Sequence, residues 1–571
     1  MEKQTKFILY QVFPRLFGNT NANLIVNGSI EANGSGKFSA FTTKALNKIK
    51  ELGITHIWYT GIIEHATQTA YTAYGTPRDH TSIVKGKAGS PYAIKDYYDV
   101  DPDLADNVEI RMKEFEDLIK RTHKAKMKVI IDFVPNHVSR EYHSDTRPPY
   151  IEDLGQYDDT TKAFAPDNNF YYIPGQPLAV NFGEKGQEED FEYSEYPAKA
   201  TGNDCFSTMP GVSDWYETIK LNYGIDYVNG GTRFFTPIPS TWKKMLEILL
   251  FWTKKGVDGF RCDMAEMVPV EFWGWAIPIV KNEADVCFIA EVYNPAEYRN
   301  YIWNGQFDYL YDKVGLYDTL RAIVCGQASA KEITKCWQAV EGIRPQMLGF
   351  MENHDEQRIA SDFFAGNAQA GIPAMIVAAT MNVNPVMIYN GQELGERGMD
   401  KEGFSGRDGR TTIFDYWSMT TVRNWVNDFR FDEEKLADEQ KTLRKLYAKL
   451  LNIAKNEAVI ARGSFHDLMY ANENNPGFNS DYVYTFLRKY KNEALLVAVN
   501  FNHSEQTARI IIPPQAFSAL KIEDNKAAVL TDLLTGEESI STLTYSCPFQ
   551  VNLPSYSGVF LKFTYKNKHS I

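Results

Sequence analysis

The sequence of 571 residues contains no run of apolar residues long enough to cross a membrane. A membrane-spanning helix needs about 18 or more consecutive apolar residues. The first residues, MEKQTKFILYQVF, also lack the apolar stretch and small-residue cleavage site of a secretory signal. We therefore expect no membrane partner and a cytoplasmic location for the chain as given, although a chain whose signal had been removed would look the same.

Closely spaced pairs of cysteines are also absent, and acidic residues outnumber basic ones. The six cysteines are scattered and none is spaced as C-x-x-C, so a disulfide framework is not indicated and a reducing compartment is favoured. The net charge of −13 argues against a nucleic acid or another polyanion as partner. No G-x-G-x-x-G follows the first expected strand, which disfavours a dinucleotide-binding fold.

What the sequence does contain is a repeated alternation of apolar strands and amphipathic helices. Residues 128–134, KVIIDFV, are almost wholly apolar, as in a parallel sheet that is covered on both faces. Eight such strands, with helical stretches between most of them, predict a (β/α)8 TIM barrel rather than an open, doubly wound sheet. The expected strands cover residues 7–13, 54–59, 128–134, 257–264, 286–290, 307–311, 348–351 and 386–389.

Two regions interrupt this alternation. The polar segment after the third strand, rich in Tyr, Asp, Pro and Gly, is too long for a simple loop and predicts an irregular inserted subdomain. From about residue 463, short alternating strands separated by turns predict an all-β C-terminal sandwich. The expected domains are the first part of the barrel (1–137), the insertion (138–213), the rest of the barrel (214–460) and the C-terminal domain (461–571).

The stretch GVDGFRCDMAE, residues 256–266, carries the first candidate site. Gly256 is expected to end a helix, and the next strand holds Arg261 and Asp263, which are two residues apart and therefore point to one side. A structural ion pair would explain this pattern as well as a site would. Three further strands favour a site, because they also end in acidic or histidine side chains: DFVPNH (132–137), AEVY (290–293) and FMENHD (350–355).

These residue types fit glycoside hydrolysis. That reaction needs one ionised and one protonated carboxyl group flanking the scissile bond. Arg261 is expected to lower the pKa of Asp263 and to keep it anionic, as a nucleophile requires. Glu291 ends an apolar strand near other carboxylates, so its pKa is expected to be raised, as a general acid requires.

The motifs DFVPNH, GFRCD, AEVY and FMENHD, in this order, resemble the four signature regions of the α-amylase superfamily of glycoside hydrolases. YQVFPRLF at the first strand, the insertion and the C-terminal β domain extend the resemblance over nearly the whole chain. The resemblance implies that Asp263 forms a covalent glycosyl intermediate and that Glu291 is the general acid and base. It also implies that Asp355 binds two sugar hydroxyls and helps to keep Glu291 protonated, while Arg261 holds Asp263 ionised.

The resemblance further implies a set of substrate-binding residues. His137 and His354 would form hydrogen bonds with hydroxyls of the cleaved sugar, and Arg358 would brace the third carboxylate. Tyr92 in SPYAIKDYYDVDP would stack under that sugar, although Pro91 stands where the family has glycine. The expected substrate-binding residues are Arg261, His137, His354, Tyr92, Asp96 and Arg358.

A calcium site is common in this family, and the resemblance places its asparagine ligand at Asn136. The partner aspartate comes from the insertion, where the matching segment TIKLNYG carries Lys220 instead. An ammonium group cannot ligate a hard cation and could occupy the position of the ion. The calcium loop after the first strand is also missing, since the chain has GNTNAN. We therefore expect no required cofactor, with Asn136 as the metal ligand if calcium is bound.

The resemblance implies a retaining hydrolase that cleaves α-1,4-glucosidic bonds in starch, glycogen or maltodextrins, with an α-glucan as partner and a monomeric chain. A transglycosylase or an α-glucosidase of the sucrose or trehalose type would use the same fold and carboxylates. Residues 265–267 replace a Lys-His pair found in many α-amylases, so this choice stays open. Trp58, Tyr59 and Trp303 fit sugar stacking and core packing alike.

Overall fold

The computed structural model describes residues 5–180 and 193–564. Eight parallel strands close into a barrel in the order β1-β16-β15-β14-β13-β12-β5-β2, which confirms the predicted (β/α)8 fold. These strands are apolar on both faces because helices cover the outside and packed side chains fill the inside. The barrel strands are β1 (Ile8–Val12), β2 (His56–Tyr59), β5 (Lys128–Phe133), β12 (Gly259–Cys262), β13 (Cys287–Ala290), β14 (Tyr309–Tyr311), β15 (Met347–Phe350) and β16 (Val386–Tyr389).

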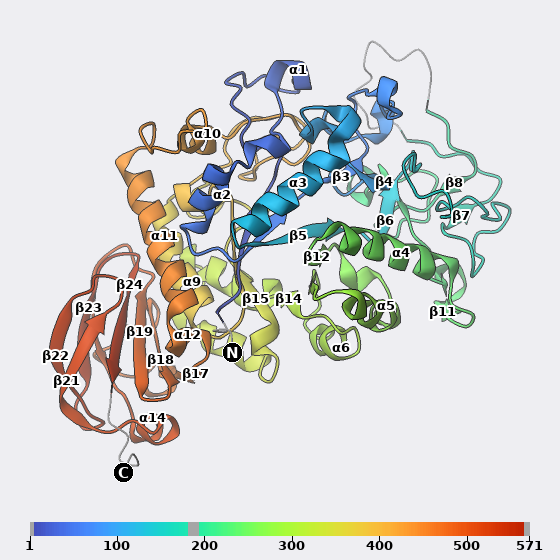
Figure 1. Ribbon diagram of the computed structural model, residues 1–571. Helices are drawn as coiled ribbons and strands as arrows, with labels where there is room; N and C mark the ends of the chain where they lie inside the picture. The colour runs from blue at the N-terminus through green and yellow to red at the C-terminus, as the bar shows by residue number, and fades with distance from the viewer. Residues whose placement is uncertain (1–4, 181–192, 565–571) are drawn as a thin grey trace.

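Amphipathic helices surround the barrel (Figure 1). The helix before β12 ends at Gly256, whose φ of 96° lies in the left-handed region that favours glycine, as the sequence predicts. The helices are α1 (Ile30–Asn33), α2 (Thr43–Lys50), α3 (Arg111–Lys124), α4 (Ser240–Lys255), α5 (Val270–Glu283), α6 (Tyr298–Trp303), α7 (Asp318–Val324), α8 (Ile333–Ala339), α9 (Ile372–Thr380), α10 (Thr420–Val426), α11 (Asp438–Asn456), α12 (Ala458–Ala461), α13 (Met469–Asn472) and α14 (Pro514–Leu520).

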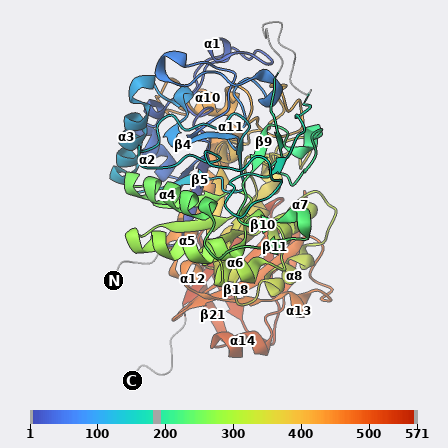
Figure 2. The same ribbon diagram turned by 90° about the vertical axis from the view of Figure 1, so that its right-hand side faces the viewer.

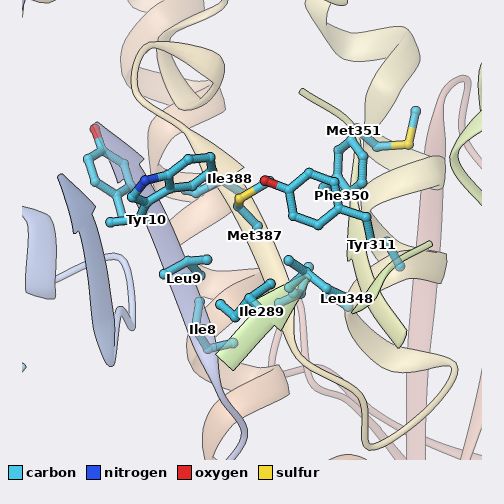
Figure 3. Packing of buried hydrophobic residues seen from close by; sticks show 14 of the residues in the cluster. Ile8, Leu9, Tyr10, Ile289, Tyr311, Leu348, Phe350, Met351, Met387 and Ile388 are labelled. Atoms are coloured by element: carbon cyan, nitrogen blue, oxygen red, sulfur yellow. The ribbon is translucent and has the colours of Figure 1, made fainter. Parts of the chain in front are cut away.

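One continuous apolar core fills the barrel and the space between its strands and helices. Figure 3 shows the part of this core where side chains of β1, β13, β14, β15 and β16 meet. The rings of Tyr311 and Phe350, on neighbouring strands, lie with their centroids 5.2 Å apart. Burying a large apolar side chain contributes roughly 1.5–3 kcal/mol. The core therefore fixes the positions of the strand ends. It thereby also fixes the positions of the polar side chains that follow the strands in the sequence.

Several short strands outside the barrel sheet form pairs. β3 (Ile63–His65) pairs with β4 (Ile94–Val100), and β6 (His137–Ser139) pairs with β9 (Thr218–Lys220). Between β6 and β9 lies the long segment expected as an insertion, whose residues 181–192 are outside the described part of the chain. The exact domain limits stay predictions. The remaining pairs are β7 (Tyr172–Ile173) with β8 (Ala198–Lys199), and β10 (Ile225–Asp226) with β11 (Thr232–Arg233).

The C-terminal region forms two antiparallel sheets, which confirms the predicted all-β domain. It lies beside α9 and α12 of the barrel (Figure 1). The buried guanidinium of Arg488 donates hydrogen bonds to backbone carbonyls of Met381, Val459, Ile460 and Gly463, and so ties the domain to the barrel. The larger sheet has the order β17 (Ser464–Asp467), β18 (Val483–Tyr490), β19 (Glu493–Asn500), β24 (Ser557–Thr564), β21 (Asn525–Asp532), β22 (Glu538–Leu543); the smaller pairs β20 (Gln506–Ile510) with β23 (Phe549–Leu553).

None of the helices in the described part of the chain is long and apolar enough to span a bilayer.

Candidate active site

The carboxyl ends of the parallel strands meet at one end of the barrel and bring together side chains that are far apart in the sequence. Asp263 follows β12, Glu291 follows β13 and Asp355 lies shortly after β15. All three line a single cavity of about 250 Å³. Tyr92 and His137, from outside the barrel strands, line it as well. The barrel topology thus assembles the expected carboxylate trio in one place.

Arg261 lies beneath this trio and is fully buried. Its Nη1 donates a hydrogen bond of 2.7 Å to Oδ1 of Asp263, and its Nη2 lies 2.9 Å from Oε2 of Glu291. Its Nε donates to the hydroxyl of Tyr311 at 3.2 Å, and the ring of Trp58 packs against it. No part of Arg261 is exposed, and its contacts in this structure are with the carboxylates; its contact with substrate stays a prediction.

The three carboxyl groups differ in what sets their pKa. Burial raises the pKa of Asp263, while the charge and hydrogen bond of Arg261 lower it and limit the rise. Burial also raises the pKa of Glu291, with Arg261 lowering it and the charge of Asp263 raising it further. Burial and the charge of Glu291 raise the pKa of Asp355 to about 8. Asp263 is therefore the group best held as an anion, and Glu291 and Asp355 together retain a proton at neutral pH.

The carboxyl group of Glu291 is held by two donors. The backbone N–H of Met264 donates to Oε2 at 2.8 Å, and the hydroxyl of Tyr293 donates to Oε1. Met264 has a φ of 42°, a left-handed conformation that costs a non-glycine residue about 1–3 kcal/mol. Tyr293 was not among the expected site residues. Its position two residues after Glu291, in the AEVY motif, was the available signal, because such residues share a side of an extended chain.

His354 holds its neighbours in place from beneath the cavity. Its Nδ1 lies 2.8 Å from Nε2 of Gln11 on β1, and its Nε2 lies 2.5 Å from the hydroxyl of Tyr92 and 3.1 Å from Oδ2 of Asp355. The rings of His354 and Tyr92 stack with centroids 5.2 Å apart. Burial and the charge of Arg261 hold the pKa of His354 well below its ordinary value, so the imidazole is neutral. The sequence gives no signal that identifies Gln11 as a site residue.

Two expected substrate-binding residues, Asp96 and Arg358, do not line the cavity, and their role in substrate binding stays a prediction. Asp96 is buried in β4, where its carboxylate accepts hydrogen bonds from the hydroxyl groups of Ser144 and Thr146. Arg358 pairs with Glu352 at 2.9 Å and donates to Thr411, and it does not border the cavity. Both groups have their hydrogen-bond partners in the loops around the site, so each stabilises a loop.

His137 borders the cavity as expected, next to residues that the sequence did not single out. Its ring lies 5.3 Å from that of Trp215. Lys85 and Glu217, from two separate loops, form an ion pair of 2.7 Å that also lines the cavity. Phe414, from the loop after β16, completes this wall. These loops are far apart in the sequence, and no local motif marks their meeting.

The position expected for calcium is taken by an ammonium group. β6 pairs with β9, and this brings Nζ of Lys220 within 2.9 Å of Oδ1 of Asn136 and 2.6 Å of Asp204. Lys220 is buried, and its charge is compensated by Asp204. Within the described residues no cluster of three or more His, Cys, Asp or Glu could hold a metal ion. The donors around Asn136 therefore do not fit a divalent cation.

We expect EDTA and calcium to leave the thermal stability of the protein unchanged, with Tm values that agree within about 1 °C. A metal stabilises a protein only by binding its folded form, and Lys220 occupies the site through its contact with Asn136. Differential scanning calorimetry with either additive checks this. The Lys220→Asp variant supplies the missing oxygen ligand, and its Tm is expected to respond to calcium. A large loss of Tm for the wild-type protein in EDTA would contradict the assignment.

The pH dependence should report the raised carboxyl pKa values. Because Glu291 and Asp355 repel each other when both are ionised, kcat/KM is expected to fall on the alkaline side with an apparent pKa of the pair near 8. The free energy of unfolding is expected to decrease between pH 3.8 and 8, since the unfolded chain releases the Asp355 proton in this range while the folded protein keeps it. An alkaline limb at the ordinary glutamate pKa of 4.5 would contradict this.

Comparison with known proteins gives the same result as the geometry. The family model for the catalytic domain of alpha amylases matches residues 11–483. Alpha-amylase 2 of Dictyoglomus thermophilum is 21% identical, over 87% of this chain and 70% of that protein, and the oligo-1,6-glucosidase of Bacillus cereus is 22% identical, over 88% and 92%. The alpha-amylase of Geobacillus thermoleovorans, solved with acarbose, has the same fold with a TM-score of 0.64 and 19% identity, covering 99% and 100% of the two chains. The chain therefore belongs to the α-amylase family of glycoside hydrolases.

Proposed function

We propose that this chain hydrolyses α-1,4-glucosidic bonds in maltodextrins, starch or glycogen with retention of configuration. One observation carries the proposal: Asp263 and Glu291 share Arg261, at 2.7 and 2.9 Å, and line one cavity together with Asp355. Double displacement requires an ionised and a protonated carboxyl group next to one bond. Burial and the negative charge of Asp263 raise the pKa of Glu291 and favour its protonated form, while Arg261 donates a hydrogen bond to the Asp263 carboxylate.

In the first step, the carboxylate of Asp263 attacks the anomeric carbon while Glu291 transfers its proton to the glycosidic oxygen. The glycosidic bond breaks, the leaving sugar departs as an alcohol, and a glycosyl ester of Asp263 remains. In the second step, ionised Glu291 removes a proton from water, which attacks the anomeric carbon and releases Asp263 as a carboxylate. Two inversions give net retention. Arg261 stabilises the carboxylate at the start and at the end of the cycle.

Asp355 and His137 are the groups we assign to substrate hydroxyls. Both border the cavity, whereas His354 is turned toward Asp355 and Tyr92. In the first step the proton of the pair lies on Glu291, so the carboxylate of Asp355 accepts hydrogen bonds from the sugar hydroxyls. In this proposal His354 fixes the position of Asp355, and Tyr92 forms the floor beneath the sugar.

An α-glucosidase that acts at chain ends is the second candidate, and the ion pair between Lys85 and Glu217 favours it. This pair joins two loops across the cavity wall at 2.7 Å, together with Trp215 and Phe414. Such a wall narrows the space for sugar units beyond the cleaved bond. The relatives named as alpha-amylase and oligo-1,6-glucosidase fit the first and the second candidate.

Product analysis distinguishes the candidates. Maltoheptaose, pullulan, sucrose and trehalose would each be incubated with the protein, and early products separated by chromatography. Mixed short maltooligosaccharides from maltoheptaose are the result expected of an α-amylase, and glucose alone is that of a chain-end glucosidase. Products longer than maltoheptaose would indicate transfer. Absence of any cleavage of these four substrates would contradict the proposed function.

A further inference from the structure

A second cavity lies on the outer surface of the barrel, between α5 and α6. It has a volume of about 880 Å³ and shares no residue with the carboxylate cavity. In Figure 2, α5 and α6 lie next to each other with β10 and β11 nearby. We refer to this cavity as the outer groove; it is lined by Glu271, Glu297, Asn300, Trp303, Asn304 and Gln306, with Arg233 at its edge.

Trp303 is the unusual residue of the outer groove. Its side chain is 58% exposed, and it is the only exposed residue among the ten tryptophans, all of which lie in the described part of the chain. Among the described residues, its indole N–H has no hydrogen-bond partner. A tryptophan is a large apolar surface with one polar handle, and leaving it in water forgoes much of the free energy that its burial would contribute. An aromatic ring that lines a groove together with a few polar groups is typical of a ligand-binding surface.

The polar groups of the groove are the amides of Asn300, Asn304 and Gln306, the carboxylate of Glu297, and the ion pair of Arg233 with Glu271. Nδ2 of Asn300 donates to Glu297 at 2.7 Å, and Nδ2 of Asn304 donates to Oδ1 of Asn300 at 2.8 Å. This chain of hydrogen bonds orients the amides of Asn300 and Asn304 in the groove that Trp303 also lines. Arg233 is paired with Glu271, so the groove has no uncompensated cation for an anionic ligand.

We propose that the outer groove binds an α-glucan chain, with Trp303 as the platform for a pyranose ring. The C–H face of a sugar is apolar and flat, while its hydroxyl groups lie at the rim, where Asn300 and Asn304 offer amide donors and acceptors. An exposed aromatic ring in a groove that also holds amide groups matches this pattern, whereas a phosphorylated ligand would meet no uncompensated cation in the groove. The identity of this ligand rests on the proposed function, because the groove would bind a second segment of the polymer that the active site cleaves.

The position of the outer groove gives the proposal a consequence. α5 follows β12, the strand before Asp263, and α6 follows β13, the strand before Glu291, so the groove belongs to the two barrel units that carry these groups. Holding a polymer at a second point raises its effective concentration at the first. The benefit should appear with long chains only, because a short oligosaccharide cannot reach both positions.

Affinity electrophoresis in native gels that contain glycogen or amylopectin tests the proposal. The wild-type protein is expected to be retarded, and Trp303→Ala is expected to bind the polysaccharide about tenfold more weakly, the typical loss when a central tryptophan contact is removed. Trp303→Phe keeps a ring and should retain part of the retardation. Tyr470→Ala, which removes an aromatic side chain that is 53% exposed in the C-terminal domain, is the matched control and should migrate as the wild type does.

Activity measurements separate this inference from the proposed function. With maltotriose, Trp303→Ala is expected to keep kcat/KM within about twofold of the wild-type value, because the outer groove and the carboxylate cavity share no residue. With glycogen, its KM should rise. Equal retardation of Trp303→Ala and wild type, or equal losses in Trp303→Ala and Tyr470→Ala, would overturn the inference. Retardation that depends on Trp303 in a protein that cleaves no maltooligosaccharide would refute the proposed function alone.

Discussion

Asp263→Asn is expected to reduce kcat on maltoheptaose by a factor on the order of 10⁴ or more, because an amide cannot form the covalent intermediate. The change keeps the volume of the side chain, and Arg261 can still donate to the remaining oxygen, so the fold should be retained. Reducing-sugar release and circular dichroism measure the two effects. Glu291 keeps its contacts with Met264 and Tyr293 in this variant, so a loss of activity would belong to Asp263.

Asp96→Asn provides the matched control for this prediction. Asp96 is also a buried aspartate whose oxygens accept several hydrogen bonds, but it does not border the cavity. We expect its replacement to lower Tm and to leave kcat within a few fold of wild type. Near wild-type activity of Asp263→Asn would remove Asp263 from the role of nucleophile. A loss of kcat in Asp96→Asn as large as in Asp263→Asn would contradict the structural role that the contacts of Asp96 indicate.

Arg261→Met is expected to lower the free energy of unfolding by about 3–5 kcal/mol at pH 7, because it leaves buried carboxylates without their cation. Asp263 and Glu291 both contact Arg261 within 3 Å, and both are almost fully buried. The difference in the free energy of unfolding between Arg261→Met and wild type should become smaller as the pH is lowered toward 5. Without Arg261 the pKa values of both groups rise further, so the folded protein takes up protons in this range and the repulsion is relieved. Urea denaturation at several pH values measures this.

Arg358→Met is the control for Arg261→Met. Arg358 is equally buried and is paired with Glu352 at 2.9 Å, but it lies away from the cavity. It should also destabilise the protein, whereas the fall in kcat should be much larger for Arg261→Met. A change of less than about 1 kcal/mol in Arg261→Met with full activity would contradict the account, since a removed buried partner ordinarily costs more.

The strands and the catalytic candidates could be predicted because their signals are local. Apolar runs such as KVIIDFV fix a strand, and a parallel barrel gathers all strand ends at one side whatever the loops do. Arg261 and Asp263 are two residues apart on one strand, so their contact follows from strand geometry. The sequence also predicts that Lys220 stands where the family has an aspartate ligand of calcium. Its hydrogen bond to Asn136 follows from the pairing of β6 with β9.

Contacts between loops could not be predicted in this way. Arg358 lies only three residues after Asp355, yet its guanidinium is paired with Glu352 and Thr411. The ion pair between Lys85 and Glu217 joins loops whose meeting depends on the whole fold. The sequence also could not separate Trp58 from Trp303. Trp58 is buried and donates to Asp132, while Trp303 lies in the outer groove, and only burial distinguishes them.

Covalent trapping tests the central claim, that Asp263 is the nucleophile of a double displacement, most directly. The Glu291→Gln variant would be incubated with a 5-fluoro-α-glucosyl fluoride, digested with a protease and mapped by mass spectrometry. The fluoride of this reagent leaves without acid catalysis. Because the variant lacks the Glu291 carboxylate that acts as the base, hydrolysis of the glycosyl ester is slow and the intermediate should accumulate. We predict a glycosyl adduct on the peptide that contains Asp263. An adduct on a different carboxylate would contradict the account.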